Sequence, residues 1–158
     1  MNGRSELSGE YQAVPDTPVL RSFYTVHGCY SPEEFRTAQA ANTLVGISGA
    51  QVAERDIGDF NFEFTVVAYW QGARGPWEFA LRATEEHLFG KPSPEFALDW
   101  RSVHTFPPGN PDFAMLKAVS MTVTTYGRIF AVAYCNGTET QRQELRIIPP
   151  QTEIDARR

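Results

Sequence analysis

The stretch Phe60-Asn61-Phe62-Glu63-Phe64-Thr65-Val66-Val67-Ala68-Tyr69-Trp70 decides the fold, because its largest apolar residues alternate along the chain. Successive side chains of an extended chain point to opposite faces, so one parity collects Phe60, Phe62, Phe64, Val66, Ala68 and Trp70. Polar residues, Asn61, Glu63 and Thr65, occupy the other parity. The pattern predicts a β-strand with one buried face, on which Phe62, Phe64, Val66 and Trp70 are almost fully buried.

The size of the chain indicates one folded unit. Its 158 residues are enough to bury a core without disulfides or metal. Aromatic residues reach 13%, so rings must supply much of the core volume. Outside the core, residues 1–18 are polar and predict an N-terminal arm, residues 19–150 a single domain, and residues 151–158 a polar tail.

Charge and cysteine content limit the function classes. The formal net charge of −5 argues against binding to nucleic acid, which requires a basic face. No apolar run approaches the roughly 18 residues that cross a bilayer, so we expect a soluble protein without membrane contact. Cys29 and Cys135 stand alone in the sequence, which favours free buried thiols in the cytoplasm or another reducing compartment over a disulfide bridge.

The clearest helix start lies at Ser31. Ser31 is a good N-cap, Pro32 follows at the first helical position, and Glu34 completes a capping box. Tyr30 and Phe35 are spaced to form a hydrophobic staple across this N-terminus. Gly46 is the first residue suited to a left-handed C-terminal position, so the sequence predicts a helix that ends there.

Alternating and β-branched residues predict the remaining strands. The expected strands cover residues 19–30, 50–57, 96–104, 115–126, 129–135 and 138–148, with 96–104 at a sheet edge. Gly127-Arg128 and Asn136-Gly137 are the expected turns of the C-terminal ribbon, and Asn-Gly is the strongest short hairpin signal. Residues 141–144 are too polar for a core, so we expect that end of the ribbon to be solvated or to contact another chain.

Residues 77–89 can be read in two ways. Residues 77–84 alternate as in a strand, yet the whole segment is rich in helix formers and has Pro76 before it and Gly90 after it. These boundaries favour a helix. A helix would cover the sheet, whereas a strand would favour a cavity.

These elements together predict an α+β domain. It has a mostly antiparallel sheet of about six to seven strands with one or two helices. If residues 77–84 form a strand instead, the same sequence predicts a β-barrel or sandwich with one helix.

Few residues are candidates for chemistry. Glu63 interrupts the aromatic strand, and inside a closed sheet it could act as a general acid; the favoured alternative is a solvated face. His27 shares a parity with Cys29, which suggests a thiolate pair, although a core thiol beside a histidine is the favoured interpretation. Tyr69 could supply a polar group to an aromatic cavity. The histidines lack zinc-binding spacing, so the sequence predicts no metal and no cofactor.

Two classes of function follow. The first is a non-catalytic interaction or structural subunit of a homo-oligomer or larger assembly, in which residues 1–18 and the Asn136-Gly137 tip contact other protein chains. The second is a small cavity-type enzyme or a carrier for an apolar small molecule, with Glu63, His27 or Tyr69 in its site. The missing catalytic pattern favours the first class.

Overall fold

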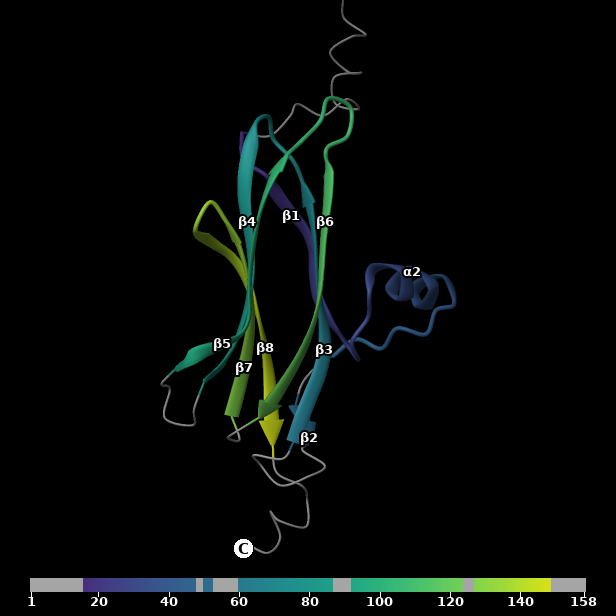
Figure 1. Cartoon of the computed structure of the whole chain (residues 1–158), viewed down its shortest axis with the longest axis vertical. Helices are drawn as coiled ribbons and strands as arrows, with labels where there is room; N and C mark the ends of the chain where they lie inside the picture. The colour runs from purple at the N-terminus through teal and green to yellow at the C-terminus, as the bar shows by residue number, and fades with distance from the viewer. Residues whose placement is uncertain (1–15, 48–49, 53–59, 87–91, 124–126, 149–158) are drawn as a thin grey trace, which may run out of the picture.

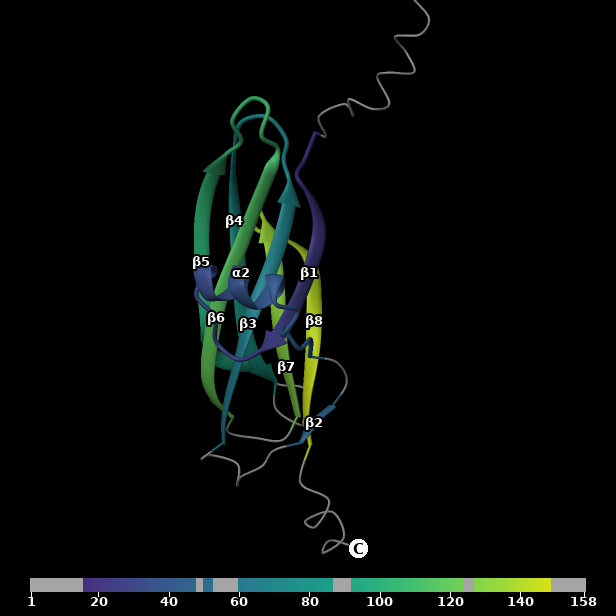
Figure 2. The ribbon, with the colours of Figure 1, turned by 90° about the vertical axis from the view of Figure 1, so that its right-hand side faces the viewer.

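The fold is a sandwich of two β-sheets with a short helix on the outside of the smaller sheet. The computed structural model describes residues 16–47, 50–52, 60–86, 92–123 and 127–148. Figure 1 views the two layers from the side, and Figure 2 shows the helix lying across the outer face of the smaller sheet.

The described elements follow one another along the chain as mainly long strands. They are β1 (Val19–His27), α2 (Pro32–Ala40), β2 (Ala50–Val52), β3 (Phe60–Gln71), β4 (Pro76–Glu86), β5 (Pro92–Thr105), β6 (Asp112–Val123), β7 (Gly127–Cys135) and β8 (Thr138–Ile148).

The strands divide into a sheet of three and a sheet of five. The smaller sheet has the order β1-β3-β6, and the larger has the order β2-β8-β7-β4-β5. Among the described strands only the short β2–β8 ladder is parallel, so the prediction of a mostly antiparallel fold is confirmed. Because α2 is the one helix of the described residues, the α+β description holds only roughly. The sheets form a sandwich and do not close into a barrel.

Strand β3 is the centre of the smaller sheet. It pairs with β1 on one side and with β6 on the other. The predicted burial of Phe62, Phe64, Val66 and Trp70 is confirmed, since each is at most 5% exposed. The side chain of Phe60 lies outside the described part of the structure.

Aromatic contacts join the two sheets. The ring of Trp70 on β3 lies 4.8 Å from that of Phe79 on β4, and Phe113 on β6 lies 5.1 Å from Phe79. Buried aliphatic residues from β4, β7 and β8 complete the core, among them Leu81, Ile129, Leu145 and Ile147. The core therefore depends on rings, as the composition indicates.

The prediction of a helix over residues 77–89 is wrong, because residues 76–86 form β4. Trp77, Phe79, Leu81 and Ala83 all face the core from one side of this strand. β4 lies between β5 and β7, so its main chain is hydrogen-bonded on both edges. Pairing and burial on this scale outweigh the helix propensity of single residues, which is worth only tenths of a kcal/mol.

The start of α2 is predicted correctly and its end is not. Ser31 and Glu34 form the capping box, and the Tyr30 and Phe35 rings pack edge to face at 6.2 Å. The helix ends at Ala40, and Asn42 adopts the left-handed conformation that the sequence assigned to Gly46. The Thr43 amide then donates to the Ala38 carbonyl at 2.9 Å, which caps the last turn.

Four further expectations of the sequence analysis have different outcomes. The Asn136-Gly137 turn is confirmed, with positive φ at both residues. The turn predicted at Gly127-Arg128 is wrong, because both residues lie inside β7 and pair with β8. The first strand ends at His27 instead of residue 30, since Gly28 has a φ of +92°. Most of the predicted strand 50–57 lies outside the described residues.

The burial of β3 gives a direct test of the core. Phe64→Ala should lower the free energy of unfolding by about 3–5 kcal/mol, because a buried ring is replaced by a cavity. Val103→Ala is the control, since Val103 is 68% exposed, and it should change stability by about 0.5 kcal/mol or less. Urea denaturation measures both variants, and equal stability for the two would show that the buried face is assigned wrongly.

Candidate functional site

Glu63 lies on the outer face of the smaller sheet and is exposed. Its neighbours there are polar, since Asn61 donates from Nδ2 to Oε1 of Glu63 at 3.5 Å and to the hydroxyl of Ser120 at 2.8 Å. For Asn61 and Glu63 this placement corresponds to the solvated-face alternative, but Thr65 on the same face is 0% exposed. The main core lies on the opposite side of β3. The desolvation that a general acid would use is therefore not provided at Glu63.

His27 and Cys29 are close in sequence but separate in their contacts. The His27 ring stacks on Phe62 at a centroid distance of 6.4 Å, and the Cys29 thiol lies 3.4 Å from the Val119 carbonyl oxygen. Partial desolvation raises the pKa of Cys29, and the nearby Glu63 carboxylate raises it further. Both effects disfavour a reactive thiolate.

The cysteines are unbridged, as expected. Cys29 is exposed and Cys135 is half-buried. The expectation that both thiols are buried is therefore wrong for Cys29, because the chain leaves β1 at Gly28 and carries Cys29 to the surface.

Tyr69 belongs to a second small core under the helix. This core centres on Val26, Phe35 and Val67, with Tyr24 and Tyr69 packed against it. The Tyr24 and Tyr69 rings lie 6.4 Å apart. Burial and the neighbouring Tyr69 raise the pKa of Tyr24 to about 12. Tyr69 therefore helps to dock α2 on the sheet and does not line a space between the sheets.

The shifted pKa of Tyr24 predicts an alkaline loss of stability. Its folded-state pKa of about 12 exceeds the ordinary value of 10.0, so folding favours the neutral phenol. This contribution is complete below pH 10 and disappears as the pH rises towards 12. Unfolding measured by circular dichroism between pH 9 and pH 12 should show a shallower decline for Tyr24→Phe than for the unaltered chain. Tyr134→Phe, on the other sheet, is the control, and an equal decline in all three proteins would contradict the assignment.

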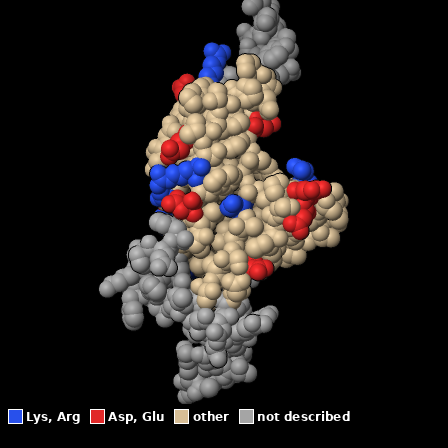
Figure 3. Space-filling model, in the orientation of Figure 1, with Lys and Arg blue, Asp and Glu red and all other residues tan. Residues whose placement is uncertain are grey.

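The outer face of the larger sheet carries a group of charges that the sequence analysis did not identify. Residues 81 and 83 of β4 point into the core, so Arg82 points outwards, and its ladder partners Asp99 and Val132 share that face. The same alternation brings together five arginines, Arg82, Arg101, Arg128, Arg142 and Arg146. We call this surface the arginine face. In Figure 3 charged side chains of both signs lie next to one another on the left-hand side, where Figure 1 places this sheet.

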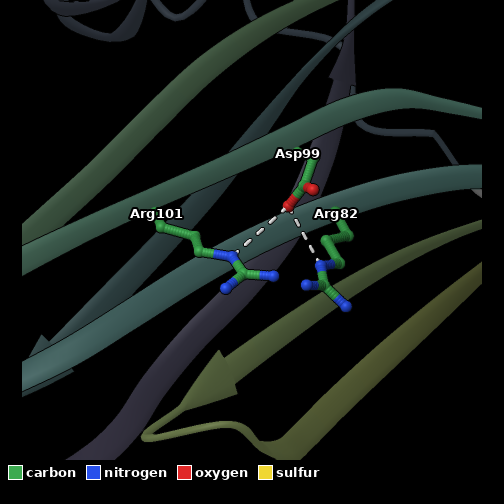
Figure 4. A network of polar contacts seen from close by, with 3 residues as sticks. All are labelled: Arg82, Asp99 and Arg101. Carbon is green, nitrogen blue, oxygen red and sulfur yellow. Dashed lines mark hydrogen bonds and ion pairs between the residues drawn. The ribbon is translucent and has the colours of Figure 1, made fainter.

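Asp99 links two of these arginines at the β4–β5 side. Its Oδ1 lies 3.0 Å from Nε of Arg82 and 3.9 Å from Nε of Arg101, as Figure 4 shows. Hydrogen bonding to Asp99 raises the pKa of Arg82. The shortest contact of Asp99 with each of the two arginines therefore ends on Oδ1.

Carboxylates on β8 pair with the arginines at the other side. Arg142 approaches Glu139 at 2.6 Å, and this hydrogen bond lowers the pKa of Glu139. Glu144 lies 3.4 Å from Arg146 and 4.0 Å from Arg128. The arginine face therefore contains alternating charges of both signs, and each of the five guanidinium groups has a carboxylate within reach.

Apolar side chains lie beneath these charges. Phe130 and Val132 point outwards from β7, yet they are only 7% and 4% exposed. The guanidinium carbons of Arg128 and Arg142 lie 5.2 Å and 4.9 Å from the centroid of the Phe130 ring. Arg128 and Arg142 thus make cation–π contacts with the Phe130 ring.

Arg82 makes a similar cation–π contact with Tyr134. The Arg82 guanidinium carbon is 5.2 Å from the centroid of the Tyr134 ring. Arginine is suited to this arrangement because its planar group can stack on a ring and still donate in-plane hydrogen bonds. A surface of this kind can recognise carboxylates by paired hydrogen bonds and can bury aromatic area at the same time.

Sequence reasoning missed the arginine face for a clear reason. Its residues come from four strands, and Arg82 had been placed on a predicted helix. The alternation of β4 was the available signal, because it puts Ala80, Arg82 and Thr84 on the parity opposite to Phe79 and Leu81. Of the polar run 141–144, only Arg142 and Glu144 share the outer face, and Oε1 of Gln143 is buried.

Comparisons with known proteins identify no family for this chain. No protein-family model matches the chain, and no curated protein shows significant sequence similarity to it. Within the described residues, no three of the His, Cys, Asp and Glu side chains are grouped so that they could hold a metal ion. The described part of the chain also contains no helix long and apolar enough to cross a membrane.

The exposure of the arginine face limits what its ion pairs contribute to folding. Asp99→Asn should lower the free energy of unfolding by about 1 kcal/mol or less, because exposed ion pairs are weak in water. Asp99 has a side-chain exposure of 41%. Chemical denaturation tests this expectation, with Asp112→Asn as the control on the other sheet. A loss of several kcal/mol would instead assign Asp99 a structural role.

Proposed function

We propose that this chain is a non-catalytic interaction subunit of a homo-oligomer. The observation that carries the proposal is the arginine face, in which guanidinium groups lie over the rings of Phe130 and Tyr134. Arginine and aromatic residues are enriched at protein interfaces, and lysine is depleted. All five basic residues of this face are arginines.

Energetics support an interface more than a purely structural role. The ion pairs of the arginine face are exposed and contribute little to folding. The same pairs become stronger when a partner excludes water from them, because the local dielectric falls. Val103, which is exposed on the same side of β5, adds apolar area beside Arg101.

The arrangement of the sandwich leaves the larger sheet available. Helix α2 covers part of the outer face of the smaller sheet, and no described helix covers the larger one (Figure 2). At the proposed hairpin contact, Asn136 is held within its own chain, since its side-chain oxygen accepts from the Glu78 amide at 2.9 Å. The other proposed contact, the N-terminal arm, lies almost entirely outside the described residues.

A carrier for an apolar small molecule is the second candidate. The strand conformation of β4 favours it, and so does an aromatic cluster between the sheets that includes Trp70, Phe79, Phe113 and His104. Trp70 is 1% exposed, and its Nε1 has no hydrogen-bond partner among the described residues. A ligand with a hydrogen-bond acceptor would satisfy this donor.

Native mass separates the two candidates. Sedimentation velocity of the full chain, from micromolar to millimolar concentration, should show a dimer or larger closed oligomer that weakens as salt is raised, because screening reduces contacts between charges. A chain that stays monomeric at every concentration would remove the subunit proposal and leave the carrier.

A further inference from the structure

The register of the larger sheet arranges the outward side chains in rows that cross the strands. In one row Asp99 on β5 pairs with Arg82 on β4, Arg82 pairs with Val132 on β7, and Val132 pairs with Arg142 on β8. This row begins with a carboxylate on β5 and ends with a guanidinium group on β8.

The neighbouring row has the opposite sense. Arg101 on β5 pairs with Ala80 on β4, Ala80 with Tyr134 on β7, and Tyr134 with Glu139 on β8. The row begins with a guanidinium group and ends with a carboxylate. Strands β5 and β8 therefore carry complementary charges at the same two heights of the sheet.

From this pattern we infer that a second copy of the chain packs face to face on the arginine face, with β5 of one copy against β8 of the other. The inference rests on the proposed function and names its partner and surface. The two copies are related by a two-fold axis that lies in the interface, parallel to the strands and between β4 and β7. This rotation places β5 of one copy over β8 of the other, and each row of side chains over the same row of the second copy. Asp99 then meets Arg142 of the second copy, and Arg101 meets Glu139.

The middle of the face is complementary in shape under the same rotation. The axis exchanges β4 with β7, so Ala80 lies opposite Tyr134 of the second copy and Thr84 lies opposite Phe130. Small residues thus face large rings, which lets the two surfaces interdigitate. The shortest contacts of Asp99 with Arg82 and Arg101 end on Oδ1, and its side chain is 41% exposed, so the carboxylate can also accept from an incoming guanidinium group.

The size of the face is sufficient for a dimer. Four long strands about 4.8 Å apart, with about nine residues each at about 3.3 Å, span about 600 Å² before the relief of the side chains is counted. A standard interface buries about 800 Å² on each partner. The arginine face is therefore of the order that a specific dimer needs.

A cysteine pair tests the arrangement without altering the charge balance elsewhere. Asp99→Cys and Arg142→Cys are combined with Cys29→Ser and Cys135→Ser, and the full chain is oxidised with glutathione disulfide. Within one chain the two positions are three strand spacings apart, about 14 Å, which exceeds the roughly 7 Å that a disulfide can bridge. We expect a covalent dimer on non-reducing electrophoresis that dithiothreitol converts to monomer.

Single-cysteine variants show which axis is correct. With Asp99→Cys alone, the two introduced thiols lie at opposite sides of the inferred dimer, so no covalent dimer should form. Efficient dimerisation of that single variant would indicate an axis across the strands and would overturn the arrangement. A double-cysteine protein that sediments as a dimer but forms no disulfide would overturn the face-to-face inference and leave the subunit proposal intact. An unaltered chain that stays monomeric at every concentration would overturn both the face-to-face inference and the subunit proposal.

Charge reversal is an independent measurement. Asp99→Arg and Arg142→Asp should each weaken dimerisation at least about tenfold, because each places like charges against one another twice in the dimer. The combined variant restores opposite charges and should recover the affinity. Arg21→Asp and Asp112→Arg, on the smaller sheet, are the matched controls and should leave it unchanged. Circular dichroism verifies folding, and unchanged affinity in folded Asp99→Arg would overturn the inference.

Discussion

The contact between Trp70 of β3 and Phe79 of β4 holds the two layers together, and the rest of the structure depends on it. The two residues are almost completely buried, and their rings are 4.8 Å apart. Because side chains alternate along a strand, fixing the inward face of β3 and β4 also fixes which residues must face outwards. The exposure of Glu63 and the position of Arg82 on the arginine face are both consequences of this packing.

The outward apolar residues of the two sheets are covered in different ways. On the smaller sheet, Val26 and Val67 point outwards and would be exposed, but α2 covers them with Phe35. On the larger sheet, Phe130 points outwards, and the guanidinium groups of Arg128 and Arg142 lie over its ring. The first solution makes a permanent second core. The arrangement on the larger sheet leaves flexible charged groups over apolar side chains. A partner can bind to the charges and to the apolar area.

The sequence predicted some features that depend on local chemistry, and it missed those that depend on pairing between distant strands. The cap at Ser31 and the turn at Asn136-Gly137 involve residues within a few positions of one another, and both were found. β4 has ambiguous local preferences, and only its two neighbouring strands make it a strand. The contact of Arg82 with Asp99 could not be inferred while β4 was assigned to a helix, because the register of β4 and β5 creates it.

The edges of the sheets carry features that oppose pairing with another chain, and this favours association through a face. Lys117 on edge strand β6 pairs with Val66 and so takes an inward position, with its Nζ 5.8 Å from the centroid of the Trp100 ring across the sandwich. An inward-pointing charge on an edge strand disfavours addition of a further strand.

The other edges are protected in different ways. Strand β1 contains an irregularity between Leu20 and Ser22. At its far end, the His27 amide donates to the Val45 carbonyl and the Thr25 carbonyl accepts from the Ile47 amide, so residues 45–47 occupy this part of the edge. On β5, Pro92 and Pro94 cannot donate to a neighbouring strand. Association through main-chain hydrogen bonds therefore meets an obstacle at each of these three edges. These obstacles do not affect association through the side chains of the arginine face. Recognition at that face would depend on charge and shape rather than on strand addition.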